Sequence, residues 1–204
     1  MSITGILTAA GLSTRMGTPK ALLPWRNTTL ITHQIRCLIA GGCNQVVVVL
    51  GYECTAISEE IETEFATDAP ITLVCNIEYD LGRATSIKQG ILSAPFDSTG
   101  FLLIAVDQPT ENHIVSRVIA EHGLADTFIT SPRYEGRGGH PVLFSSKLKS
   151  ELLNINDDTQ GLKPVFENYR SVLNCIDFET PLVRLDLNDY DTYLRNYSLF
   201  SEDA

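Results

Sequence analysis

The first quarter of the chain contains no acidic residue. Residues 1–52 hold Arg15, Lys20, Arg26 and Arg36, so this segment carries +4, whereas the whole chain carries −10 and the remainder therefore −14. The asymmetry has two readings: it accompanies two buried strands by chance, or it marks a surface that faces an anionic ligand and keeps competing carboxylates away. The negative total speaks against general nucleic-acid binding, which needs a basic face against the phosphates.

Long apolar runs and paired cysteines are also missing. The longest purely apolar stretches, 46–50 and 101–106, are too short to span a bilayer. The N-terminus lacks the basic and apolar segments of a secretory signal. The five cysteines are scattered without a C-x-x-C pair, which favours buried reduced thiols over disulfides or a zinc site. We expect a cytoplasmic protein without membrane contact.

Strands and helices are predicted to alternate along the chain. Thr28 or Thr29 would cap the first helix, Gly41-Gly42 would end it, and Gly123 would stop the fourth. The pattern predicts one three-layer α/β domain over 1–204 with a mainly parallel sheet. Strands are expected at 2–8, 45–50, 71–75, 101–106, 127–131, 141–144, 172–177 and 182–187, and helices at 30–40, 54–65, 86–93, 112–121, 146–153, 162–169 and 190–199.

The loop after the first predicted strand reads AAGLSTRMGTPK. A P-loop requires G-x-x-x-x-G-K-[ST], but here five residues separate Gly11 from Gly17, and Lys20 comes three positions later. The dinucleotide pattern G-x-G-x-x-G fails at Ser13. The composition still suits a triphosphate, because glycines let backbone amides approach closely and Arg15 and Lys20 supply charge. An ordinary solvated loop is the alternative.

Polar residues follow two other predicted strands, and ligands of such sheets bind beyond the carboxyl ends of the strands. Asp107 comes directly after 101–106, where a carboxylate would be a natural Mg²⁺ ligand or, equally, the cap of the next helix. Between 76 and 86, Gly82 would allow close approach of a planar base, and Ser86 would donate to a sugar or base. A loop with a capping serine would look the same.

Together these stretches resemble one family, the MobA-like nucleotidyltransferases, which attach a nucleotide to molybdopterin. The family signature L-A-A-G-x-S-x-R-M-G-x-x-K appears as LTAAGLSTRMGTPK, with Thr8 as its one departure. The resemblance extends to about Asp191 and implies a three-layer α/β/α Rossmann-like fold with a mixed, mainly parallel sheet. Later family motifs are matched by Asn76, Gly82 and Ser86, by the D-x-P at 107–109 and by GHPVLF at 139–144.

The resemblance implies roles for individual residues. The part to about residue 110 would bind the nucleotide, and 111–204 would bind the acceptor and complete the metal site. The catalytic residues would be Arg15, Lys20 and Asp107. The nucleotide would contact Ala9, Ala10, Gly11, Ser13, Arg15, Gly17, Lys20, Asn76, Gly82 and Ser86. Mg²⁺ would be held by Asp107, Asn188 and Asp186, and the acceptor would lie near His140 and Lys163.

Three positions bear on which member of the family this chain resembles. The family's G-D-x-G-x-R becomes DDTQGLK, with Lys163 in place of arginine. Its D-I-D-T-P-E-D becomes DLNDYDT, with Asn188 where a second aspartate is expected. Guanylyl-transferring members tend to have glycine where this chain has Ala10, so the Ala-Ala-Gly sequence resembles the CTP-using branch.

The reaction implied is transfer of CMP from CTP to the phosphate of a molybdopterin-type acceptor, with release of pyrophosphate. The alternatives are use of GTP, a sugar or alditol phosphate as acceptor, or an NTP-binding maturation factor without turnover. The departures at Asn188 and Lys163 would favour the last of these. A transient contact with a molybdoenzyme is a further expectation, and no nucleic-acid partner is expected.

Overall fold

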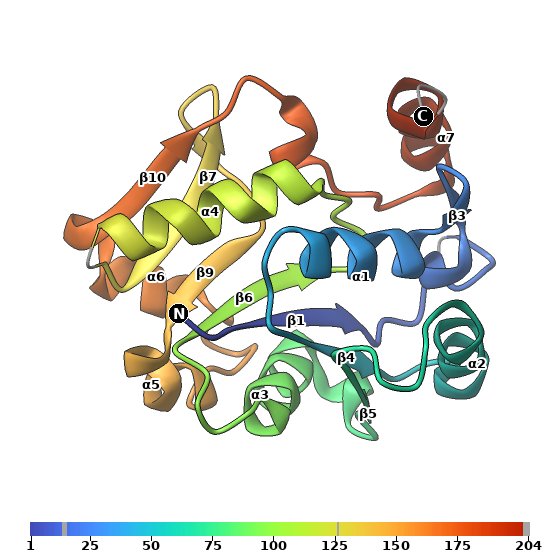
Figure 1. Ribbon diagram of the computed structural model, residues 1–204, viewed down its shortest axis with the longest axis horizontal. Coiled ribbons are helices and arrows are strands. Elements are labelled where there is room, and N and C mark those ends of the chain that lie inside the picture. The colour runs from blue at the N-terminus through green and yellow to red at the C-terminus, as the bar shows by residue number, and fades with distance from the viewer. Residues whose placement is uncertain (14–15, 126, 202–204) are drawn as a thin grey trace.

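The computed structural model describes residues 1–13, 16–125 and 127–201. Within these ranges, a mixed sheet crosses the molecule (Figure 1). Strand β9 runs antiparallel to both of its neighbours, and the other principal pairs are parallel. The spatial order is β10 (Leu173–Asp177), β7 (Ile129–Tyr134), β9 (Val142–Ser145), β6 (Gly100–Ala105), β1 (Ile3–Ala9), β4 (Gln45–Leu50) and β5 (Ile71–Cys75), with β8 (Arg137–Gly138) on β7.

Helices cover both faces of the sheet, which confirms the predicted three layers (Figure 1). Successive strand side chains point to opposite faces, so Leu7 enters one core and Ile6 the other. The first face carries α1 (Leu30–Ala40), α2 (Cys54–Glu64), α4 (Asn112–Leu124) and α7 (Tyr190–Ser201). The second carries α3 (Arg83–Ser93), α5 (Lys149–Leu153) and α6 (Lys163–Asn168).

Short elements connect these layers. Strands β2 (Pro24–Trp25) and β3 (Thr28–Thr29) form a small antiparallel hairpin before α1. The Thr29 side chain accepts a hydrogen bond from the backbone N–H of Thr32 at 3.4 Å, which confirms one of the two predicted caps. Single 3₁₀ turns occur at η1 (Lys20–Leu22), η2 (Tyr79–Leu81), η3 (Ser146–Leu148), η4 (Arg170–Val172) and η5 (Pro181–Arg184).

Three sequence predictions are wrong. The segment 182–187 is not a strand: Pro181 begins the 3₁₀ turn η5, and Leu182 and Val183 bury their side chains in the core instead of joining the sheet. Gly123 does not stop α4, which continues to Leu124 because one glycine inside a packed helix is tolerated. Cys75 is exposed, unlike the buried Cys37 and Cys43. No helix in the described residues is long and apolar enough to cross a membrane.

Candidate active site

A cleft of about 400 Å³, the first cleft, opens beyond the carboxyl ends of β1 and β6. Parallel strands bring the loops that follow them to the same edge of a sheet, which is why residues distant in the sequence meet there. The predicted site residues that line it are Ala9, Ala10, Gly11, Ser13, Lys20, Gly82, Ser86, Asp107 and Asn188.

An ion pair lies in the wall of the first cleft. Nζ of Lys20 is 2.9 Å from Oδ2 of Asp107, and the two side chains are only 15% and 26% exposed. The hydroxyl of Ser13 accepts a hydrogen bond from the backbone N–H of Lys20 at 3.1 Å. This bond fixes the position of the Lys20 backbone. Asp107 is not a helix cap, because Glu111 is the residue that precedes α4. Asp107 instead lines the first cleft, where its carboxylate pairs with Lys20.

The loop that carries Ser13 has an uncommon backbone conformation at two positions. Ser13 and Gly17 both have positive φ angles, 51° and 67°, a conformation that glycine adopts without steric cost. Met16 is buried in the core and anchors the loop beneath the cleft. Gly17 is exposed, and a Cβ there would meet nothing within 4 Å, so its backbone angle and not space requires glycine. Arg15 lies outside the described residues, and its role stays a prediction.

Asn76 does not line the first cleft but binds a residue that does. It is buried, and its side-chain amide donates hydrogen bonds to the hydroxyls of Thr85 and Ser86, at 2.9 and 3.0 Å. Ser86 itself lines the cleft from the first turn of α3. Asn76 thus orients Ser86, and its predicted contact with a nucleotide stays a prediction.

Asp157 is a residue that sequence reasoning missed. Its Oδ2 accepts a hydrogen bond from the backbone N–H of Ala84 at 2.9 Å and so caps the start of α3 from a segment 73 residues away. A Cβ on Gly82 would collide with this carboxylate, and Gly82 has φ 123°. The only sequence signal was that Asp157 is the first residue of the DDTQGLK motif. Both the lack of space for a Cβ and the positive φ angle therefore require glycine at position 82.

Two segments carry the three predicted metal ligands. The backbone N–H of Leu187 donates to the Asp107 carbonyl at 2.7 Å, which brings 186–188 beside Asp107. Asn188 lines the first cleft. The Asp186 carboxylate instead accepts a hydrogen bond from the Gln108 side chain at 2.8 Å. Oxygen donors in this arrangement suit a hard divalent cation.

A second cleft, of about 790 Å³, adjoins the first through Thr8, Arg83 and Ala105, which line both. Its wall is basic, and no described residue that lines it is acidic. The wall also has an apolar part that includes Phe166. Its cationic side chains are Arg83, Arg133 and Arg170.

One of the three arginines of the second cleft already forms an ion pair with a carboxylate. Both Nε and Nη2 of Arg133 donate to Asp177 at 2.9 Å, so that guanidinium is already paired. Sequence reasoning missed Arg83 and Arg170, because nothing in the local pattern marks them. Lys163, the predicted acceptor residue, is exposed and donates to the Gln160 side chain at 2.6 Å instead of lining this cleft.

His140 lies in the second cleft with one nitrogen free. It is 8% exposed, and its Nε2 is buried without a hydrogen-bond partner among the described residues. Burial lowers the pKa of His140 below its ordinary value, although the negative charge of Asp186 and a hydrogen bond with the Leu185 backbone act in the opposite direction. The ring is therefore a neutral imidazole at neutral pH. Such a group can accept a proton or a hydrogen bond from a ligand.

Two curated relatives align along most of the chain. Nicotine blue oxidoreductase from Paenarthrobacter nicotinovorans is 30% identical over 183 residues, covering 86% of each protein. Molybdenum cofactor cytidylyltransferase from Escherichia coli K12 is 26% identical over 202 residues, covering 97% of this chain and 96% of that protein.

A solved structure and a family model agree with this picture. The Rv0371c protein of Mycobacterium tuberculosis H37Rv superposes with a TM-score of 0.82 at 28% identity, covering 97% of this chain and 98% of that one. A second structure of the same protein, in complex with manganese, has a TM-score of 0.77 at 27% identity, with the same coverage. The model of the MobA-like NTP transferase domain matches residues 5–172. The chain therefore belongs to the MobA-like NTP transferase family.

Proposed function

We propose that this chain is a nucleotidyltransferase that moves CMP from CTP to the phosphate of a molybdopterin-type acceptor. The observation that carries the proposal is the pair of adjoining clefts. The first combines close backbone approach with the Lys20–Asp107 pair, as a metal-bound triphosphate needs. The second has a basic wall free of acidic residues among those described, as an anionic acceptor needs, in a chain whose net charge is −10.

The Lys20–Asp107 ion pair is the resting state of the first cleft. When a nucleotide enters, Lys20 would turn to the phosphates, and the Asp107 carboxylate would be released to hold a divalent cation. Because each charge has a partner before and after, the exchange leaves no buried charge uncompensated. Arg15, by resemblance, adds a second cation to the phosphates.

The metal site would use Asp107 and Asn188, with Asp186 supporting it through Gln108. A manganese complex of Rv0371c supports a divalent cation in this family, and an all-oxygen donor set suits Mg²⁺. When bound, the ion would neutralise charge on the phosphate oxygens. Asn188 is a neutral donor, so we expect weaker metal binding than with a second carboxylate.

The chemistry needs positioning more than proton transfer. An oxygen of the acceptor phosphate forms a bond to the α-phosphorus of CTP while the bond from that phosphorus to pyrophosphate breaks. The attacking oxygen is already anionic, so catalysis consists of alignment and charge stabilisation. Arg83, which lines both clefts, stands where the two phosphates would meet. His140 and Arg170 would hold the acceptor.

The test is pyrophosphate release with each NTP, Mg²⁺ and a molybdopterin-type acceptor. We expect CTP to be the best donor. Higher turnover with GTP would contradict the cytidylyl assignment, and Mg²⁺-dependent NTP binding without pyrophosphate would favour the maturation factor. Sugar and alditol phosphates serve as competing acceptors.

Ala10 provides a matched variant for base choice. It lines the first cleft, and its carbonyl accepts a hydrogen bond from the backbone N–H of Tyr52 at 3.2 Å, which holds that part of the wall. Ala10→Gly removes one methyl group, and we expect the ratio of GTP to CTP turnover to rise by about 10-fold or more, within the range that one methyl typically discriminates. An unchanged ratio would remove Ala10 from base selection.

Redox turnover is the second candidate, because one relative that covers most of this chain is named an oxidoreductase. The apolar part of the second cleft would accept an aromatic substrate. A parallel assay with a hydride donor such as NADPH and an aromatic substrate separates the two: reduction of the substrate with loss of NADPH, and no pyrophosphate release from NTPs, would favour this candidate.

A further inference from the structure

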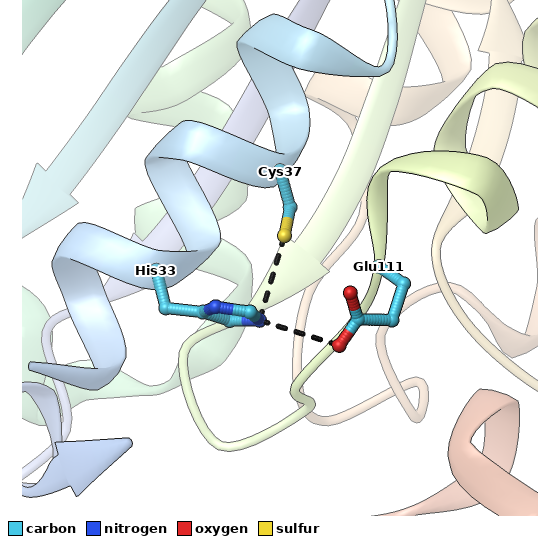
Figure 2. A group of neighbouring side chains, drawn as sticks. All are labelled: His33, Cys37 and Glu111. Atoms are coloured by element: carbon cyan, nitrogen blue, oxygen red, sulfur yellow. Dashed lines mark hydrogen bonds and ion pairs between the residues drawn. The ribbon is translucent and has the colours of Figure 1, made fainter. Parts of the chain in front are cut away.

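A cluster of metal-ligating side chains lies where α1 meets the loop before α4 (Figure 2). His33 and Cys37 are four residues apart on α1 and so project from the same face of the helix. Glu111 immediately precedes α4 and points toward them. Nε2 of His33 is 3.4 Å from Sγ of Cys37 and 3.8 Å from Oε1 of Glu111. None of the three lines either cleft.

We infer that His33, Cys37 and Glu111 bind a thiophilic divalent cation, in the first place zinc. Imidazole nitrogen, thiolate sulfur and carboxylate oxygen are the ligands that zinc takes in proteins. All three ligand atoms lie within 4.8 Å of one another. Around a tetrahedral zinc ion with ordinary bond lengths, the nitrogen would lie roughly 3.4–3.6 Å from the sulfur and the oxygen. Only a small movement is needed, chiefly at Glu111, the most exposed of the three.

The geometry distinguishes a metal site from a catalytic triad. In a cysteine–histidine–acid triad, the thiol meets one ring nitrogen and the acid orients the other. Here Cys37 and Glu111 both face Nε2 of His33, which places all three ligand atoms around one point. Burial also raises the pKa of the Cys37 thiol to about 12, so without a cation it is a neutral, unreactive group.

Unsatisfied polar atoms flank the same cluster. Nε of Arg26 and Oγ1 of Thr110 are buried without a hydrogen-bond partner among the described residues. Arg26 donates through Nη2 to Oε1 of Glu111 at 2.6 Å, and Nε2 of His33 is in hydrogen-bond contact with the Thr110 carbonyl oxygen at 2.9 Å. A cation at Nε2 would replace the proton of that second hydrogen bond. Buried polar atoms rarely lack partners in folded proteins. The Thr110 hydroxyl oxygen is an atom that a cation or its bound water would contact, whereas Nε of Arg26 is a donor that a water bound to the ion would satisfy.

A cation at this position would fasten α1 to the loop that carries Asp107. The neighbouring Gln34 already binds that loop: its Nε2 donates to the carbonyl of Gln108 at 2.7 Å, and its Oε1 accepts from the Thr110 N–H at 3.2 Å. The proposed ion would add a link through Glu111, four residues beyond Asp107. Its role is structural, and it does not depend on which nucleotide the chain uses.

The experiment uses Co²⁺ as a spectroscopic probe for zinc in the chelator-treated full chain. We expect one equivalent of Co²⁺ to produce a thiolate-to-cobalt charge-transfer band that zinc abolishes. Cys37→Ser should remove the band and weaken zinc binding by at least the roughly 10–100-fold that outer-shell changes cause. Cys75→Ser, which removes an exposed thiol outside the cluster, should keep it. Absence of the band, or its survival in Cys37→Ser, would overturn the proposal.

Two more variants separate this site from the active site and from a folding defect. Asp107→Asn changes the proposed catalytic cleft alone, so the cobalt band should persist there, and its loss would overturn the assignment to Cys37. Glu111→Gln keeps the thiol and the contact with Arg26 but removes an anionic ligand. Zinc should raise the melting temperature of the wild type and much less that of Glu111→Gln. Equal increases would contradict Glu111 as a ligand.

Discussion

Replacement of Lys20 by alanine should separate catalysis from folding. The lysine side chain is 15% exposed and reaches Asp107 at 2.9 Å, so the variant leaves one carboxylate without its partner. That carboxylate is 26% exposed and remains hydrated in part. The loss therefore falls between that of a surface pair and that of a fully buried one.

The two effects differ in size. At 2.9 Å and an effective dielectric constant of about 20, the gross attraction between Lys20 and Asp107 is about 6 kcal/mol. Desolvation and hydration of the exposed portion offset most of it, leaving a stability loss of about 1–2 kcal/mol. For a chain of this length, that corresponds to a fall in melting temperature of about 2–8 °C. Loss of a contact to charge that develops in the transition state costs about 10²–10³-fold in turnover.

The assay is pyrophosphate release at saturating CTP and acceptor at 25 °C, with a melting curve for each protein. We expect Lys20→Ala to remain folded and to lose about 10²-fold or more in kcat. Lys149→Ala is the control, because Lys149 lies on α5 and lines neither cleft. Turnover within about threefold of wild type would refute the charge role of Lys20, since that factor corresponds to less than about 1 kcal/mol of barrier.

Two further predictions concern the fold around the site. Gly82→Ala should lower the melting temperature more than Gly42→Ala, because both have φ above 100° but only the former drives a Cβ into the Asp157 carboxylate; equal losses would contradict that clash. Burial lowers the pKa values of His33, His122 and His140 in the folded state, so the unfolded chain takes up more protons as the pH falls through about 6.5. The melting temperature should therefore fall as the pH is lowered from 7.5 to 5.5. A constant or rising melting temperature would refute the lowered pKa values of these histidines.

The sequence was sufficient to place the residues that follow strands. The β-branched run at 45–50 and the apolar run at 101–106 predict buried parallel strands, and both are buried in the centre of the sheet. Once those strands are adjacent to β1, the loop that ends at Lys20 and the turn at Asp107 must share an edge. The main part of the first cleft follows from this rule without knowledge of any side-chain contact.

Contacts between distant segments could not be predicted in the same way. Asp157 caps α3 across 73 residues, and no local pattern pairs it with Ala84. Arg83 and Arg170 line the second cleft from segments 87 residues apart, and no local pattern places them together. Strand order is set by packing of the whole chain, whereas periodicity reports only which face of an element is buried.

The position of Asp107 depends both on the local sequence pattern and on contacts between distant segments. Its place after β6 is local, but its setting depends on Lys20 from the first loop and Leu187 from the C-terminal segment. On the other side, Gln34 of α1 binds the carbonyl of Gln108. Lys20 thus contacts the carboxylate itself, and Leu187 and Gln34 hold the backbone around it. A substitution at any of these three residues disturbs a contact that holds the turn at Asp107, so loss of activity alone would not locate the chemistry, and each variant needs a stability measurement beside it.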